Sequence, residues 1–242
     1  LPLLLLVPMT GQVYAAETGG VVETFSCNYN SGKGANDLDG AVGFWQSQIK
    51  KLNSADLNKY FGSVVTPIKG GSGADWFWLG GSPDLNTYTR GQNDYNTSSE
   101  GQAADARFAK VATCTSNMFF SEQIYAGAPP VEGDTNAIIQ SYGCTLKKGK
   151  SMANVLVAEQ MIIARSEKLN AKTNIYRLTP YMANVPADIV YLIGHDDLVS
   201  FGSSSTEFMT APGYRSFLGA INSVMDCNSA LSAMEVTHAP MQ

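Results

Sequence analysis

The chain has 242 residues, a net charge of −5, 44% hydrophobic residues and only 15% charged residues. Its length is sufficient for one large domain or two small ones with a buried core. The acidic net charge argues against a nucleic-acid-binding protein, which needs a basic surface to neutralise phosphates. Beyond the first residues, no segment approaches the ~20 consecutive apolar residues of a membrane-spanning helix.

The first 16 residues are uncharged and have the pattern of a secretory signal peptide. A leucine-rich run, Leu1–Val7, precedes the small residues Ala15 and Ala16. The apolar stretch is too short to span a membrane and is broken by Pro8 and Gly11. We therefore expect residues 1–16 to be a signal peptide, and the mature protein to be secreted or periplasmic without a membrane partner.

The rest of the sequence contains an internal repeat of two similar units. Residues 66–114 match residues 179–227 at a constant offset of 113, with 11 identities and no gap. Within them, ADWFWLGGSPDL (74–85) and ADIVYLIGHDDL (187–198) correspond. Upstream the offset is 117, and a four-residue difference in the loop after the first helix of each unit explains the change. An internal duplication accounts for this pattern.

Each unit is predicted to contain a strand, a long helix, two strands, further helical residues and a last strand. We assign residues 17–127 to the first unit, 128–136 to a linker and 137–242 to the second unit. Helical residues are expected to begin with Ser82 as N-cap and Pro83 at the first helical position, and to continue to the second cysteine of the unit. The expected strands are 21–29, 60–68, 75–80, 118–125, 137–146, 174–181, 188–194 and 231–237, with long helices over 37–52 and 152–169.

The order βαββαβ is the ferredoxin-like arrangement, in which the first and third strands are central and the fourth lies beside the first. Four cysteines in an exported protein indicate disulfides, and their number alone allows three pairings. The repeat places one cysteine of each unit on the first strand and one just before the fourth. We therefore predict the disulfides Cys27–Cys114 and Cys144–Cys227, with free buried thiols as the alternative.

An apolar third strand, a polar turn, a short helix and a proline-marked second helix resemble the dimeric α+β barrel superfamily. This superfamily includes antibiotic-biosynthesis monooxygenases, EthD-like proteins and haem-handling barrels. The resemblance implies that two ferredoxin-like units pack sheet to sheet, here as a tandem duplication in a single chain. Gly81 and Gly194 stand where the family has a tryptophan, so no catalytic residue is transferred. The closest match is 193–218, with Asp196, Asp197, Phe201, Phe208 and Ala211-Pro212-Gly213.

The two long helices differ at positions that should face the core. The first carries an apolar stripe, and in the second Glu159 and Ser166 replace two of its members. A carboxylate within an apolar stripe is costly unless it is paired or faces a wet cavity, where burial raises its pKa and suits it to proton transfer. The alternative is a rotated helix with Glu159 in solvent. The stripe is Leu38, Val42, Trp45, Ile49 and Leu52, against Val155, Glu159, Ile162, Ser166 and Leu169.

His195 replaces Ser82 at the turn after the third strand and precedes Asp196 and Asp197. An imidazole held by carboxylates can transfer protons or bind an anion, whereas an exposed histidine at a helix start has only a capping role. Since His195 and His238 are the only histidines, we expect no multi-histidine metal site. We also predict that the protein uses no cofactor.

Aromatic side chains supply candidates for ligand binding. Trp76 and Trp78 share one face of a strand and could line a small-molecule cavity, as could Tyr176 and Tyr191 in the second unit together with Ser166. Packing in the core is the alternative for all of these aromatic residues.

These features support three hypotheses. The first is an exported α+β barrel that binds a small, largely apolar molecule between its sheet and helices. The second is a cofactor-independent oxygenase or isomerase that uses Glu159 and His195 for proton transfer. The third is a non-catalytic extracellular assembly or scaffold protein, and an oligomer is compatible with all three.

Overall fold

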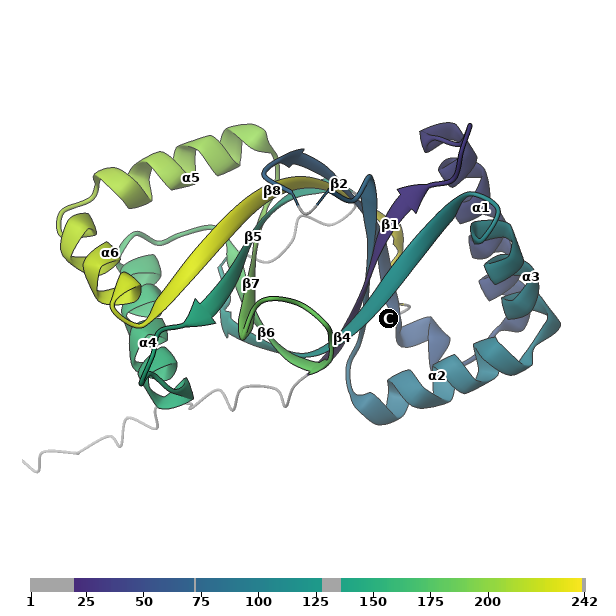
Figure 1. The fold of residues 1–242 in the computed structure, drawn as a ribbon, viewed down its shortest axis with the longest axis horizontal. Coiled ribbons are helices and arrows are strands. Elements are labelled where there is room, and N and C mark those ends of the chain that lie inside the picture. The colour runs from purple at the N-terminus through teal and green to yellow at the C-terminus, as the bar shows by residue number, and fades with distance from the viewer. Residues whose placement is uncertain (1–19, 72, 128–135, 241–242) are drawn as a thin grey trace, which may run out of the picture.

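Eight antiparallel strands close into a barrel, and the helices lie on its outer side in two groups at opposite ends of the molecule (Figure 1). This computed structural model describes residues 20–71, 73–127 and 136–240. The expected signal peptide, 1–16, and nearly all of the expected linker, 128–136, lie outside the described residues. No helix within these ranges is long and apolar enough to span a membrane.

The first half of the chain supplies four strands and three α-helices. Its sheet has the order β2-β3-β1-β4, the order of a ferredoxin-like unit. Its elements are β1 (Gly20–Tyr29), α1 (Ala35–Leu52), the 3-10 helix η1 (Leu57–Lys59), β2 (Phe61–Lys69), β3 (Trp76–Ser82), α2 (Leu85–Thr97), α3 (Ser99–Phe108) and β4 (Ala112–Tyr125).

The second half repeats this order of strands and α-helices, with the sheet order β6-β7-β5-β8. It has no 3-10 helix in the loop between its first helix and its second strand. Its elements are β5 (Asn136–Leu146), α4 (Met152–Lys168), β6 (Asn174–Met182), β7 (Ile189–His195), α5 (Leu198–Thr210), α6 (Tyr214–Asn222) and β8 (Met225–His238).

Two seams join the halves into the closed barrel. β2 pairs with β8, and β4 pairs with β6. The predicted α+β barrel is therefore present. Because every strand of the described chain has a neighbour on both sides, this ring offers no sheet edge through which copies could add strands.

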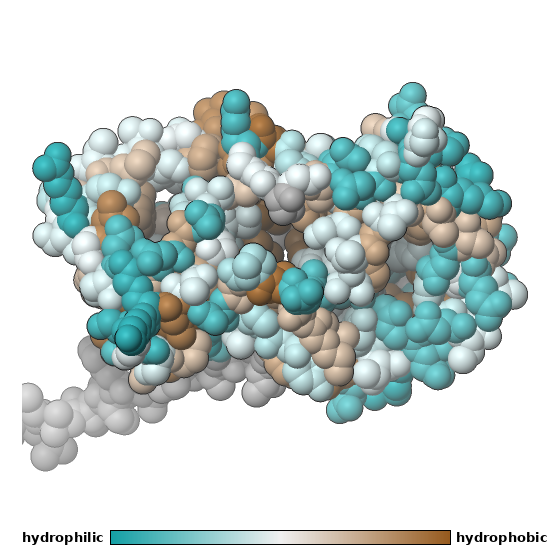
Figure 2. All heavy atoms as spheres, viewed as in Figure 1, coloured by the Kyte–Doolittle hydropathy of each residue, from teal (hydrophilic) through white to brown (hydrophobic). Residues whose placement is uncertain are grey.

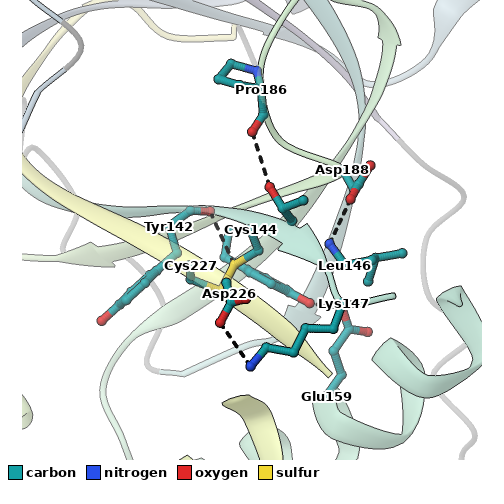
Figure 3. Close-up of a disulfide and its surroundings, with 11 residues drawn as sticks. Tyr142, Cys144, Leu146, Lys147, Glu159, Pro186, Asp188, Asp226 and Cys227 are labelled. Atoms are coloured by element: carbon teal, nitrogen blue, oxygen red, sulfur yellow. Dashed lines mark hydrogen bonds and ion pairs between the residues drawn. A yellow bond between two sulfur atoms is a disulfide. The ribbon is translucent and has the colours of Figure 1, made fainter. Parts of the chain in front are cut away.

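One disulfide lies in each half, with the pairing expected from the repeat. Cys27 and Cys114 are directly opposite on β1 and β4, and Cys144 and Cys227 are opposite on β5 and β8. Figure 3 shows the second disulfide beside the ion pair between Lys147 and Asp226. Both cysteines of each pair lie within strands, because β4 begins at Ala112 and β8 at Met225. The prediction that helical residues continue to the second cysteine is wrong.

The helix starts also differ from the prediction. Ser82 is not an N-cap but the last residue of β3, where it pairs with Val21 of β1. Asp84 caps α2 instead, since its carboxylate accepts a hydrogen bond of 2.8 Å from the backbone N–H of Thr87. Asp197 caps α5 in the same way through Ser200. The aspartate that occupies matching positions in the two repeats, Asp84 and Asp197, is thus the N-cap residue of the helix in each half.

Alternate residues of each strand point outward, toward the helices, or inward, toward the barrel axis. The outward face of the first half packs against α1 to form one buried core, and that of the second half packs against α4 to form another. The predicted stripe of α1 is buried at Leu38, Val42, Trp45 and Ile49. The buried ionisable side chains Glu23, Glu159, Arg177 and His195 all lie in these two sheet–helix layers.

Candidate functional site

Glu159 lies on the sheet-facing side of α4 and is only 2% exposed. The interpretation in which Glu159 points into solvent is therefore wrong. One carboxylate oxygen accepts a hydrogen bond of 2.7 Å from the hydroxyl of Tyr191 on β7, and the other is bound by the guanidinium of Arg177 on β6. The buried carboxylate is thus held by two donors from the sheet, which is the pairing that its burial requires.

Arg177 connects this carboxylate to the surface. Its second terminal nitrogen binds Glu122 of β4, a half-exposed residue across the β4–β6 seam. Burial raises the pKa of Glu159, while the hydrogen bond from Tyr191 and the charge of Arg177 oppose that shift. The result is a polar cluster of Glu159, Arg177, Tyr191 and Glu122, which we call the Glu159 cluster.

His195 is the last residue of β7 and is 6% exposed, so it is not an exposed capping histidine. Its Nδ1 lies 3.2 Å from the hydroxyl of Ser204 on α5, and its ring contacts Phe201 edge-on at 5.3 Å between centroids. Its Nε2 is buried without a hydrogen-bond partner. Burial lowers the pKa of His195, and the charge of Asp196 opposes the shift, so the ring is neutral near pH 7.

Glu159 and His195 do not meet. Tyr191, which binds Glu159, precedes His195 by four residues on β7, or about 13 Å along a strand. No hydrogen bond within the described residues joins the two groups. A shared proton-transfer step of these two side chains is therefore not built into this arrangement.

The structure separates the aromatic candidates. Trp76 and Trp78 are buried in the core of the first half, where the indole N–H of Trp78 donates to Tyr60 at 2.7 Å. Tyr176 precedes Arg177 on β6 and so faces the barrel axis, on the opposite side of the sheet from Tyr191. The other second-half candidate, Ser166, is buried on the same side of α4 as Glu159.

A second buried carboxylate, Glu23, was missed by the sequence analysis. It accepts hydrogen bonds of 2.7 Å from the hydroxyls of Tyr60 and Tyr88, and no cation contacts it within the described chain. Burial raises the pKa of Glu23, and the two tyrosine hydrogen bonds oppose the shift. The signal was present, because Glu23 interrupts the outward face on which Val21 and Cys27 are apolar.

The four-residue difference between the repeats corresponds to η1. In the first half, the segment after α1 carries Leu57 and Tyr60, which fill the space between the sheet and α2. The fit is close, because a Cβ on Gly91 of α2 would lie 3.3 Å from Leu57. In the second half this segment is shorter, and Ser204 stands where α2 has Gly91.

The helices that follow β7 are correspondingly less buried. No residue of α5 or α6 is buried, whereas α2 and α3 bury five residues between them. The inward stripe of α5 is only half-buried, and the surface is hollowed beneath α5 (Figure 2). We call this region the second-half hollow. The stripe consists of Phe201, Ser204, Ser205 and Phe208.

A separate surface pocket of about 500 Å³ lies at the β2–β8 seam, beside the start of α5. Its walls are apolar at Val64, Ile138 and Leu198, and Asp196 and Glu235 stand among its lining residues. Neither Glu159 nor His195 lines it. This pocket is therefore distinct from the Glu159 cluster.

Comparison with known proteins shows the fold. No family profile matches the chain, and no curated protein matches its sequence. Among solved structures, a protein from Fusobacterium nucleatum assigned as a monooxygenase superposes with a TM-score of 0.58 at 8% identity, covering 91% of this chain and 93% of that chain. A similar protein from Lactobacillus acidophilus gives 0.55 at 10% identity, covering 90% and 94%.

Two structures with other assignments also superpose. A haem-binding protein from Thermus thermophilus gives a TM-score of 0.52 at 9% identity, with 91% of each chain covered. A variant of chlorite dismutase from Candidatus Nitrospira defluvii gives 0.53 at 9%, covering 91% and 93%. These superpositions cover at least 90% of this chain, so the architecture expected from the resemblance is shown at the level of the fold.

The residues of this chain do not fit a haem as they stand. The Nε2 of His195 has the chemistry of an axial iron ligand, but it is buried against protein. The guanidinium of the buried Arg177 is already bound to two carboxylates, Glu122 and Glu159, and is not free to bind a further anionic group. Within the described residues, no group of three His, Cys, Asp or Glu side chains is placed to hold a metal ion.

Proposed function

We propose that the protein binds a small, largely apolar molecule in the second-half hollow, between the outward face of β5, β7 and β8 and the helices α5 and α6. The observation that carries the proposal is the difference between the two halves. The first half fills this layer with Leu57, Tyr60 and two tryptophans, whereas the second half has a shorter loop and half-exposed aromatic side chains.

The chemistry of the walls defines the ligand. Phe201, Phe208 and Phe217 supply aromatic surface, and Phe208 and Phe217 contact each other edge-on at 5.3 Å. Polar groups are few: the hydroxyls of Ser204 and Ser205 on α5, the buried imidazole of His195 behind them, and the guanidinium of Arg165, which lies over the Phe208 and Phe217 rings at 4.8 and 5.4 Å. Mostly apolar walls with a small number of polar groups are typical of small-molecule sites.

Two of the three predicted ligand-binding residues of the second half have a place in this proposal, whereas Tyr176 faces the barrel axis and has none. Tyr191 and Ser166 lie in the sheet–helix layer that adjoins the hollow, with Tyr191 bound to Glu159. Trp76 and Trp78 occupy the filled layer of the first half, so we assign them to its core.

The test is a fluorescence titration with N-phenyl-1-naphthylamine, an uncharged apolar probe. The wild-type protein should enhance its emission and saturate at one site per chain. Ser205→Trp should abolish saturable binding because it fills the hollow from α5. The matched control is Thr206→Trp, which places the same side chain at the next position of α5, where it is exposed to solvent. This variant should bind the probe as the wild type does. Equal binding by both variants would refute the location.

A second candidate function is proton transfer at Glu159 in a cofactor-independent oxygenase or isomerase. The raised pKa of this carboxyl group supports it, as does the similarity to structures assigned as monooxygenases. Glu159→Gln should then abolish turnover of a candidate substrate while leaving binding of the naphthylamine probe intact. Unchanged turnover would remove this candidate.

We also propose that the chain arose by tandem duplication and acts outside the cytoplasm. The constant offset of 113 supports the first statement, and two disulfides, typical of oxidising compartments, support the second. Sequencing the amino terminus of protein isolated from its source should find cleavage after Ala15 or Ala16. An uncleaved terminus on cytoplasmic protein would contradict export.

A further inference from the structure

The solvent-facing side of α4 is apolar, which is unusual for an exposed helix face. Two of its residues are strongly exposed, Leu156 at 47% and Val157 at 67%. Of the nine exposed residues of α4, three are polar: Gln160, Glu167 and Lys168. The other six are Met152, Ala153, Leu156, Val157, Met161 and Ala164.

The equivalent helix of the first half provides an internal reference. At the positions of Leu156 and Val157, α1 has Asp39 and Gly40. Its exposed residues are mostly polar or glycine, as expected for a face in contact with water. In addition, α3 packs along α1 more extensively than α6 packs along α4. The apolar face of α4 is therefore a property of the second half, and no element of the described chain covers it.

Both ends of α4 are basic. Residues 147–172 contain six lysines and arginines against two glutamates, although the whole chain has a net charge of −5. Lys148 and Lys150 precede the helix, Lys168 is its last residue, and Lys172 follows it; all four are exposed. In Figure 2, hydrophobic and hydrophilic residues lie side by side where Figure 1 places α4.

We propose that this face of α4 docks on an anionic lipid surface. A helix with an apolar face and lysines beside it lies in the interface of such a bilayer, with its apolar residues among the acyl chains and its lysines at the headgroups. The charges argue against pairing of two α4 helices. Because both ends are basic, parallel and antiparallel pairs alike bring lysines against lysines. The docking differs from the sequence-based expectation of no membrane partner, and it needs no spanning helix.

The test is co-sedimentation of the purified protein with vesicles of phosphatidylcholine, with or without phosphatidylglycerol. Binding is expected only to the anionic vesicles and should weaken as salt is added. Lys148→Glu combined with Lys150→Glu should lower the partition coefficient by at least roughly 25-fold, or about 5-fold for each lysine lost. These residues are exposed, so the variant should fold normally.

Leu156→Gln combined with Val157→Gln tests the apolar contribution and should weaken binding by at least about 10-fold. The matched control is Phe44→Gln on α1, an exposed apolar residue at the position of Met161, and should bind as the wild type does. Circular dichroism and light scattering are recorded for every variant. Absence of binding to anionic vesicles would overturn the proposal. The proposal would also be overturned if the protein bound no vesicles but formed an oligomer that Leu156→Gln with Val157→Gln dissociates, since the face would then be an interface between copies.

Discussion

Removing the charge of Arg177 is the perturbation whose outcome follows most directly from the Glu159 cluster. Arg177→Met leaves the carboxylate of Glu159, which is 2% exposed, with Tyr191 as its one remaining donor among the described residues. Breaking a buried ion pair by deleting one partner costs about 3–5 kcal/mol of unfolding free energy. For a chain of this length that corresponds to a fall in Tm of roughly 6–20 °C. Glu122→Gln, which removes only the half-exposed partner of Arg177, should cost less than about 1 kcal/mol.

The pH dependence of the Arg177→Met variant gives a second, independent readout. In this variant the folded-state pKa of Glu159 lies above its unfolded value. Burial raises the pKa, and the charge of Arg177, which opposes the shift in the wild type, has been removed. The stability is then fully present below the unfolded pKa and is lost as the pH rises through the folded pKa. The variant should therefore be closer to the wild type at pH 4 than at pH 7.

Urea unfolding monitored by circular dichroism at both pH values measures these differences. Combining Arg177→Met with Glu159→Met should restore most of the lost stability, because no unpaired charge remains in the layer. The reasoning would be refuted if Arg177→Met matched the wild type at pH 7. It would also be refuted if the double variant were as unstable as the single one.

Three further predictions concern the first half. The raised pKa of Glu23 makes the wild type lose stability as the pH rises through that pKa, whereas Glu23→Gln carries no ionisable group at this position. The stability of Glu23→Gln relative to the wild type should therefore increase from pH 5 to pH 8, as measured by thermal unfolding. Cys27→Ser with Cys114→Ser should cost about 4–5 kcal/mol in urea unfolding, since the closed loop spans 87 positions. Gly80→Ala should lower the free energy of unfolding by about 1–3 kcal/mol, because the new Cβ would lie 1.8 Å from the hydroxyl of Tyr60. The control Gly194→Ala, whose Cβ would meet nothing within 4 Å, should be nearly neutral in the same assay.

Much of the fold could be predicted because the repeat supplied two readings of one pattern. The long helices were predicted to begin within two residues of their observed starts, and the cysteine pairing followed from matching positions in the two halves. The misplaced boundaries have a physical reason. Ser82 is a good capping residue and precedes proline, but strand pairing with Val21 extends β3 through it and leaves Asp84 to cap the helix.

The candidate site was only partly predictable. Substitution of a valine by Glu159 within an apolar stripe singled out this carboxylate, but the sequence left both a buried and a solvent-exposed position open, and only the structure shows that it is buried. Its partner Arg177 could not be identified from the sequence, since the pairing depends on how β6 packs against α4. In the sequence, the η1 segment that fills the space between the sheet and α2 appears only as a change of four residues in the offset between the repeats. Its effect on the space beneath α2 and α5 depends on three-dimensional packing.

The central claim is that the second-half hollow holds a small apolar molecule. Native mass spectrometry of wild-type protein and Ser205→Trp, each isolated from the source organism, tests it most directly. The wild-type chain should carry one additional non-covalent mass that collisional activation releases, and Ser205→Trp should lack it while retaining both disulfides. A wild-type chain that carries no such mass would contradict the claim, as would the same mass on both proteins.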